Sequence, residues 1–187
     1  DKNNTGGDPV NLRTGGLELT QTDFTLFSRG FPIDLTRIYN SKLSDWNGRF
    51  GAGWNFKYNN FYYQDPTTKN VQIYLDGLLT TKFTTIDNGA TFVPAPGIRD
   101  SLIVEGNNVV YKEQNGIKYI FSKKLTNNLG LIQSMTDPNG NTINFTYTDV
   151  RGIPLLTGIT DASNRQITFA YPIDTTATNW DKVISIT

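Results

Sequence analysis

Apolar and polar residues alternate along much of this chain with a period of two, which is the pattern of β-strands. The alternation is clear in residues 131–147, where Ile143, Phe145 and Tyr147 are separated by threonine and asparagine. Residues 137–141 interrupt it with Asp-Pro-Asn-Gly-Asn. Proline fixes φ and Asn-Gly tolerates a positive φ, so this segment is typical of a tight turn. The stretch predicts a β-hairpin whose isoleucine, phenylalanine and tyrosine are buried on one face.

The same hairpin is present twice in the sequence. Residues 155–171 follow residues 131–147 with a shift of 24, so that Asp161 takes the place of Asp137 and Tyr171 that of Tyr147. The copies lie near residues 131–149 and 155–171, and a third, truncated copy begins at residues 182–187. Self-similarity at such a period predicts a repeat architecture, in which each unit covers the apolar face of its neighbour.

Short β-branched or aromatic runs fill residues 71–121 and are separated by turn signals. Asp76-Gly77, Asn88-Gly89 and Asn115-Gly116 are dipeptides typical of hairpin turns. No stretch keeps an apolar i, i+3, i+4, i+7 pattern over three turns, so little helix is expected. The sequence therefore predicts an all-β fold, in which antiparallel β-hairpin repeats form a long, twisted and coiling sheet.

Aromatic residues concentrate in residues 54–63, which we interpret as one long strand. Alternation predicts two sets, Trp54, Phe56, Tyr58 and Tyr62 on one face and Phe61 and Tyr63 on the other. One set must then face away from the core of a single sheet. That set either packs on a neighbouring layer, which we favour, or forms an exposed platform for stacking sugar rings. The residues that we consider for glycan binding are Trp46, Tyr62 and Tyr63.

The repeat pattern Leu-x-x-Ile-Thr-Asp-x-x-Gly-Asn/Arg-x-Ile-x-Phe-x-Tyr resembles the YD repeat of the Rhs family. The first copy matches it at Asp137, Gly140, Asn141, Phe145 and Tyr147, and the second at Asp161, Phe169 and Tyr171. The second copy carries Asn164 where the pattern has glycine. Asparagine also accepts a left-handed conformation, so the turn is expected to be kept.

The first part of the chain resembles the lead-in domain that precedes the YD repeats in Rhs proteins. Its ordered motifs are Asp8-Pro9-Val10, Thr14-Gly15, Asp23-Phe24-Thr25-Leu26, the segment 35–41 and the segment 48–54. The resemblance assigns structural roles to Asp8, Arg37, Tyr39, Gly51, Gly53 and Trp54. We therefore divide the chain into a flexible N-terminus (1–7), a lead-in domain (8–96) that ends near Pro94-Ala95-Pro96-Gly97, and a β-meander with YD repeats (97–187).

Composition narrows the classes of function. The formal net charge is +0, which does not fit nucleic-acid binding, and no apolar run approaches the roughly 20 residues of a membrane span. The chain has no cysteine and no histidine, which excludes disulfides, thiolate zinc sites and the commonest general base. We predict no catalytic residue, no cofactor, no bound metal and no insertion into a membrane.

Three groups of residues could still carry chemistry, and for each we favour a structural role. Asp137 and Asp161 are expected to form turns, solvated and with ordinary pKa values, and not to act as an acid-base pair. Asp137-x-Asn139-x-Asn141 is spaced like the start of a calcium loop but lacks its glycine and closing glutamate. Arg37 could hold a ligand carboxylate, but we expect it either to brace a turn or to pair with an aspartate such as Asp34 or Asp45.

The resemblance to Rhs proteins implies that the full-length protein continues into a large hollow β-shell, which encloses a toxic C-terminal domain for delivery. Related proteins build cell-surface or adhesion structures. For this chain the resemblance implies two partners, the rest of its own shell and the enclosed domain. It also implies that the protein is secreted or displayed on the bacterial surface, with any export signal outside this segment. We expect this segment to be non-enzymatic. The edge strand at 183–187 is expected to fray or to pair with another copy. A carbohydrate-binding module or adhesin is the competing reading.

Overall fold

The computed structural model describes residues 10–11, 15–45, 47–123 and 127–187. All regular structure in this part of the chain is β, apart from a short 3₁₀ helix, η1 (Ser41–Leu43). Every strand pair is antiparallel. The predicted all-β fold is confirmed. The described residues contain no helix long and apolar enough to cross a membrane.

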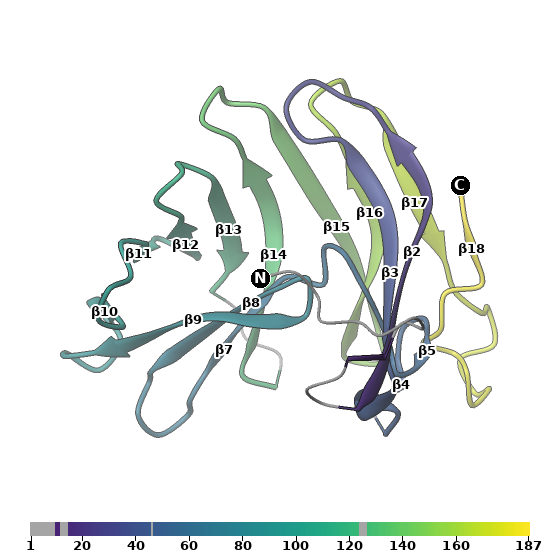
Figure 1. Ribbon diagram of the computed structural model, residues 1–187, viewed down its shortest axis with the longest axis horizontal. Coiled ribbons are helices and arrows are strands. Elements are labelled where there is room, and N and C mark those ends of the chain that lie inside the picture. The colour runs from purple at the N-terminus through teal and green to yellow at the C-terminus, as the bar shows by residue number, and fades with distance from the viewer. Residues whose placement is uncertain (1–9, 12–14, 46, 124–126) are drawn as a thin grey trace.

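A small sheet forms from the first part of the chain. Its strands are β1 (Val10–Asn11), β2 (Gly16–Leu26), β3 (Ile33–Asn40) and β6 (Trp54–Phe56), in that spatial order. A separate two-stranded ribbon, β4 (Asn47–Gly48) and β5 (Gly51–Ala52), lies between β3 and β6 in sequence. The long β2–β3 hairpin is the main element of this part of the fold (Figure 1).

A 12-stranded sheet contains the rest of the described strands. Its main path runs β10-β9-β8-β7-β14-β15-β16-β17-β18, and β11, β12 and β13 branch from β14. The bounds before the branch are β7 (Phe61–Gln64), β8 (Val71–Leu75), β9 (Leu78–Thr85) and β10 (Phe92–Pro94). The branch is β11 (Ser101–Glu105), β12 (Asn108–Lys112) and β13 (Lys118–Ser122). The repeat strands are β14 (Leu129–Thr136), β15 (Thr142–Val150), β16 (Ile153–Thr160), β17 (Gln166–Ala170) and β18 (Ser185–Ile186).

Strand β14 joins the two halves of this sheet. Its first residues pair with β7, where Leu131 lies opposite Phe61, and its later residues pair with both β13 and β15. Aromatic contacts link β7 and β9 with the branch: the ring centroids of Tyr62 and Phe121 are 5.8 Å apart, and those of Phe83 and Tyr111 are 6.1 Å apart. These rings are at most 1% exposed, so they form the first part of the core.

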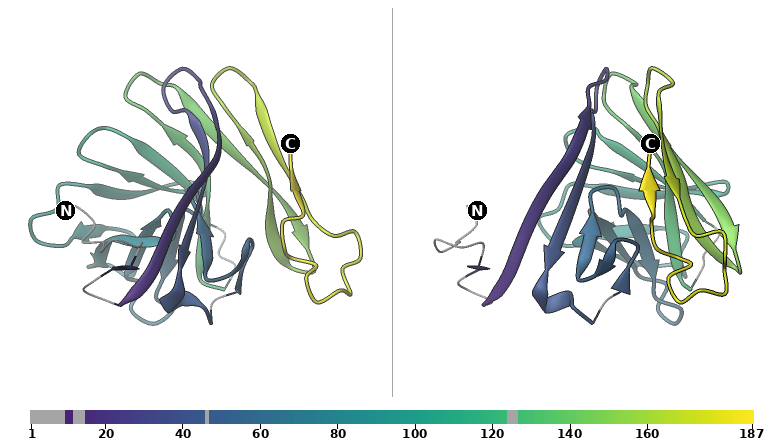
Figure 2. Two further views of the ribbon diagram at one scale, coloured as in Figure 1. Left: turned by 45° about the vertical axis from the view of Figure 1, so that its right-hand side comes forward. Right: turned by 90° about the vertical axis from the view of Figure 1, so that its right-hand side faces the viewer.

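The second part of the core lies between the lead-in residues and the repeat strands. Ring centroids are 5.9 Å apart for Tyr58 and Phe145, and 6.3 Å apart for Phe56 and Phe169. Ile33 on β3 is fully buried. Figure 2 shows that the β2–β3 hairpin and the repeat strands approach each other at the end where the repeat turns lie and separate toward the other end. Residues of the lead-in, including Ile33, Phe56 and Tyr58, therefore cover the apolar face of the repeats.

The repeat hairpins have the same register, as the sequence predicts. Met135 lies opposite Ile143 in the first hairpin, and Ile159 lies opposite Ile167 in the second. Phe145 pairs with Ile159 between the hairpins, and Phe169 pairs with Ile186 at the third copy. In the part of the chain that the structure describes, β18 pairs with β17 alone. The period is confirmed, and no described strand pairs with the outer edge of β18.

Residues 54–63 are not one strand, so that prediction is wrong. Strands β6 and β7 belong to different sheets, and Tyr58 between them has a φ of 79°. Its amide donates to Asp76 Oδ1 (3.0 Å), and its hydroxyl donates to Pro32 O (3.0 Å). These bonds are long-range in sequence and stabilise a left-handed tyrosine that alternation alone does not reveal.

The boundary that we place at residue 96 does not separate sheets. Residues 61–94 contribute β7 to β10, which pair into the same sheet as the repeats. The small sheet ends at Phe56. The Pro94-Ala95-Pro96-Gly97 segment instead connects β10 to β11 within the large sheet.

Candidate functional site

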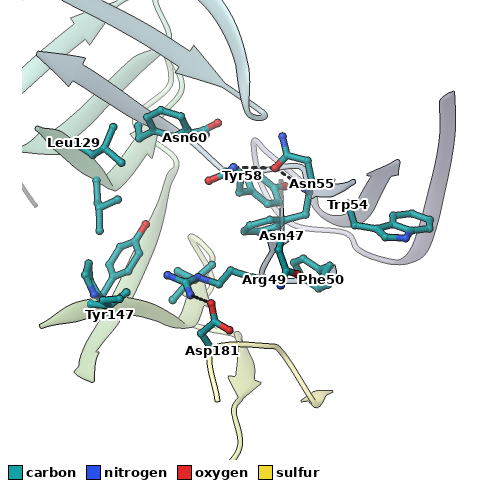
Figure 3. Close-up of a pocket in the computed structure, with 18 of the residues that line it drawn as sticks. Asn47, Arg49, Phe50, Trp54, Asn55, Tyr58, Asn60, Leu129, Tyr147 and Asp181 are labelled. Atoms are coloured by element: carbon teal, nitrogen blue, oxygen red, sulfur yellow. Dashed lines mark hydrogen bonds and ion pairs between the residues drawn. The ribbon is translucent and has the colours of Figure 1, made fainter. Parts of the chain in front are cut away.

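A cavity of about 420 Å³ lies where residues 47–61 face the repeat strands (Figure 3). One wall consists of residues from β4 to β7, including Phe50 and Tyr58, and the other of residues from β14 to β16. The hydroxyl of Tyr147 points into this space (Figure 3). The cavity is thus formed between the predicted lead-in and the predicted repeats.

An ion pair closes part of the cavity wall. Arg49 Nη1 lies 2.8 Å from Asp181 Oδ2, and the backbone amide of Val183 donates to Arg49 O at 3.0 Å. Asp181 Oδ1 also accepts from Lys182 Nζ (2.6 Å). Both partners of the first pair are partly exposed, so the pair contributes at most about 1 kcal/mol. Its main effect is to attach the β17–β18 connection to the β4–β5 turn.

Asparagine side chains on the cavity wall are occupied by internal hydrogen bonds. Asn55 Nδ2 donates to Asp76 O (2.9 Å), and Asn55 Oδ1 accepts from Asn59 Nδ2 (2.8 Å). Asn60 Oδ1 accepts from the Asp76 amide (2.7 Å). These amides hold the Asp76-Gly77 turn against the corner between β6 and β7. Sequence reasoning missed this network, although the Asn59-Asn60 pair and the Asp-Gly turn were visible.

The tyrosines that end the two repeats are half-buried and pack against the core. The Tyr171 hydroxyl donates to Leu156 O at 2.9 Å. Burial raises the pKa of Tyr171 to about 12 and raises the pKa of Tyr147 above its usual range. Both phenols stay protonated near neutral pH, so neither can act as a base there.

The repeat turns are built around their aspartates. Asp137 Oδ1 accepts from the amides of Asn139 (2.9 Å) and Asn141 (2.8 Å), and Asp137 Oδ2 accepts from Asn141 Nδ2 (2.8 Å). Gly140 follows with a φ of 87°. The spacing that resembles a calcium loop therefore serves a hydrogen-bonded turn, in which the carboxylate oxygens already have donors.

Asp161 occupies the same position in the second turn but is buried, so the expectation of a solvated carboxylate is wrong. Its side chain is 0% exposed. Burial alone would raise the pKa of Asp161, but hydrogen bonds from the Arg165 amide, the Arg165 guanidinium and the Ser163 amide outweigh it and lower the pKa. The Asn141 side chain and turn amides likewise lower the pKa of Asp137. The expectation of ordinary pKa values is therefore wrong for both.

Arg37 braces the fold, but its partner differs from the prediction. Its Nε and Nη2 contact the two oxygens of Asp23 at 2.6 and 2.7 Å, whereas Asp34 pairs with Lys57. A β-bulge explains the choice, because Thr22 and Phe24 pair with adjacent residues of β3 and leave Asp23 as the extra residue. The prediction that Arg37 pairs with Asp34 or Asp45 is therefore wrong.

The other lead-in motif residues lie around the same arginine. The Arg37 guanidinium carbon is 5.2 Å from the centroid of the Trp54 ring, and the Tyr39 and Trp54 centroids are 5.3 Å apart. Gly53 has a φ of 73°, and a Cβ there would lie 2.8 Å from Tyr39. Glycine therefore allows the chain to pass close to the tyrosine ring. Gly51, with a φ of 108°, is the first residue of β5, directly after the turn at residues 49–50.

Of the glycan candidates, the two that the structure describes, Tyr62 and Tyr63, do not form an exposed platform. Tyr62 is 1% exposed and belongs to the core, so it cannot stack on a sugar. Tyr63 is half-buried on the opposite face of β7. Trp46 and the motif residue Asp8 lie outside the described residues. Tyr62 instead packs against Phe121 of the branch, in line with the favoured alternative that the aromatic residues pack on a neighbouring layer.

Comparison with known proteins relates both parts of the chain to larger bacterial proteins. Residues 7–77 match a domain of unknown function, DUF6531. The chain is 30% identical over 145 residues to the tRNA nuclease WapA of Bacillus subtilis strain 168 and to the tRNA3(Ser)-specific nuclease WapA of Bacillus spizizenii. Each alignment covers 75% of this chain, which spans only 6% of the length of either relative. The chain is thus similar to a small part of these much longer bacterial proteins.

Proposed function

We propose that this chain is the opening wall segment of an Rhs-type β-shell, which encloses a toxic domain of the same polypeptide until delivery. The observation that carries the proposal is the common register of the successive hairpins. When successive hairpins pair in the same register, each one extends the same sheet and the same core, so no separate core is needed for each repeat.

The two faces of the repeat strands fit the role of a wall. Phe145 and Phe169 are buried beneath the lead-in, whereas Asn144, Thr146 and Thr168 on the other face are exposed. A sheet with one covered and one polar face can separate an enclosed domain from its surroundings. Pairing each strand with the next also protects the backbone groups of its edges.

The relatives support a place for this chain within a much longer protein. They are named as tRNA nucleases, and the matching part is 6% of their length. We propose that any nuclease or other toxic activity of this polypeptide resides outside the present segment, which is non-enzymatic. The carboxylates of its repeat turns support this, because turn amides already occupy their oxygens. Secretion or display on the cell surface is part of the same proposal.

Protease protection in the full-length natural protein tests enclosure. The wall variant Phe145→Ala/Phe169→Ala removes two buried rings, and truncation of a buried phenylalanine costs about 3–5 kcal/mol. We expect the C-terminal domain of the wild type to resist protease and that of the wall variant to be cleaved at least about ten times faster.

The matched control is Asn144→Ala/Thr146→Ala, which changes the exposed face of the same strand and should leave protection unchanged. Equal, rapid cleavage of the C-terminal domain in the wild type and the wall variant would contradict enclosure.

A further inference from the structure

The tip of the β2–β3 hairpin lies between two successive repeat turns. The β14–β15 turn (137–141) and the β16–β17 turn (161–165) are at the same end of the sheet, because two antiparallel strands separate them. Adjacent strands are about 4.8 Å apart, so the turns are about 10 Å apart. Figures 1 and 2 show the hairpin tip beside both turns. Residues 27–31, which we term the tip, therefore have two neighbours distant in sequence.

The tip meets the first turn through a glycine. Gly30 has a φ of 75°, and a Cβ at this position would lie 2.6 Å from both Asn141 Cβ and Asp137 Oδ2. Those side chains cannot move aside easily, because Asn141 Nδ2 donates to Asp137 Oδ2 at 2.8 Å. The backbone of the tip thus rests directly on the first turn, with no room for a side chain.

The tip meets the second turn through an arginine. Arg165 Nε donates to Asp161 Oδ2 at 2.8 Å, and Arg165 Nη2 donates to the carbonyl oxygen of Phe27. The Ser28 hydroxyl on the tip is buried beside Asp161. Among the described residues it has no hydrogen bond of ordinary geometry. The hydroxyl is nevertheless close enough to the Asp161 carboxylate to help lower the pKa of Asp161. One guanidinium therefore holds the turn together and binds the tip.

The two turns are not interchangeable in these contacts. At equivalent positions the first has Gly140-Asn141 and the second has Asn164-Arg165. An arginine at 141 would occupy the place of the tip backbone next to Gly30. An asparagine at 165 is too short to bond Asp161 and Phe27 at once. The tip therefore fits a turn with asparagine at position 141 followed by a turn with arginine at position 165.

We infer that the β2–β3 hairpin is a docking element for a specific pair of repeat turns, with Arg165 as the residue that determines which turn it binds and Gly30 as the residue that permits the approach. Its partner is the ordered pair of turns 137–141 and 161–165. In a chain with several similar repeats, this contact fixes the position of the lead-in over the first two.

Exchanging the two turns tests the inference without changing the composition. The swap variant carries Gly140→Asn, Asn141→Arg, Asn164→Gly and Arg165→Asn, so each turn receives a sequence that the other already uses. Amide hydrogen exchange of the 187-residue chain is the measurement. We expect amides of residues 26–33 to exchange at least about tenfold faster, while amides of β15 and β16 keep their protection. Unchanged protection of residues 26–33 in the folded swap variant would overturn the proposal.

A second set of variants decides the matter if the swap variant does not fold. Arg165→Lys keeps a positive charge for Asp161 but places its donors on a single nitrogen, without the planar fork that spans Asp161 and Phe27, and it should release the tip by the same measure. Gly30→Ala should release it as well. Gly152→Ala is the control, because Gly152 has a φ of 78° and nothing within 4 Å of its Cβ position. If Gly30→Ala and Gly152→Ala have equal effects on residues 26–33, or if Arg165→Lys has none, the docking contact is not specific.

Discussion

Asp161 is a buried carboxylate whose charge is matched within its own turn. Its Oδ1 accepts from the amides of Ser163 (2.8 Å) and Arg165 (2.9 Å), and Arg165 Nε binds its Oδ2. An asparagine would replace one of the two acceptor oxygens by an NH2 donor and would remove the negative charge that faces the guanidinium. We expect Asp161→Asn to lower the free energy of unfolding by about 2 kcal/mol in urea denaturation.

Asp137→Asn is the matched change in the first turn and should cost less, because Asp137 is only half-buried and its side-chain partner, Asn141, is neutral. If the two variants lose the same free energy of unfolding, burial of Asp161 by the lead-in tip does not add to the stability of the second turn.

The pH dependence of stability should have two limbs. The folded-state pKa of Asp161 lies below the value of about 3.9 in an unfolded chain, so its contribution is present above that pH and is lost as the pH falls through the folded pKa. Burial raises the pKa of Tyr58 and of Tyr62 to about 12, so their contribution is present below pH about 10 and is lost as the pH rises toward 12.

Because the chain has no histidine, stability should be nearly constant from about pH 6 to pH 8. Urea denaturation as a function of pH measures these limbs. The acid limb should be shallower in Asp161→Asn, and an acid limb identical to that of the wild type would contradict the assignment of part of it to Asp161.

At the scale of elements, β14 depends on a glycine where it pairs with β7, because Gly130 lies opposite Tyr62. A Cβ on Gly130 would collide with the Tyr62 ring and would lie 2.7 Å from Ser122 O. Gly130→Ala should therefore reduce stability by about 1–3 kcal/mol through overpacking. Tyr62→Ala should relieve part of this collision, so the double variant should be less unstable than the sum of the two single variants. Strict additivity in urea denaturation would mean that β14 does not press on Tyr62.

The β18 edge is the second element with a testable consequence. Phe169 and Ala170 pair with Ile186 and Ser185, and the other edge of β18 has no strand among the described residues. We expect the isolated 187-residue chain to associate through this edge at high concentration, and Ser185→Lys to suppress the association. Light scattering measures the mass. Thr146→Lys, on the exposed face of the sheet, is the control and should leave the association unchanged. A chain that stays monomeric at all concentrations would rule out this edge as an interface.

The sequence predicts the hairpins well because their signals are local. Turn dipeptides and alternation indicate the repeats, and the buried positions of Phe145 and Phe169 follow from the period of two. The long-range contacts are not encoded in such patterns. Asp23 reaches Arg37 through a bulge, and Asp161 is buried because the lead-in tip lies over its turn. Those features required the three-dimensional structure.

At the scale of the whole molecule, the chain places a lead-in hairpin over the first repeats of a coiling sheet. Its all-β class and its repeat register could be predicted from sequence, whereas the pairing of β7 with β14 could not, since residues 61–63 and 129–131 carry no signal of each other. The cavity beside Tyr147 is a product of that long-range assembly. The large sheet therefore includes strands on both sides of the boundary at residue 96.

Cryo-electron microscopy of the full-length natural protein tests the central claim most directly. If this chain opens a shell wall, residues 129–187 should form the first strands of a continuous, closed and hollow sheet, with density for a C-terminal domain inside it. Separate compact domains joined by linkers, or a C-terminal domain outside the sheet, would contradict the account.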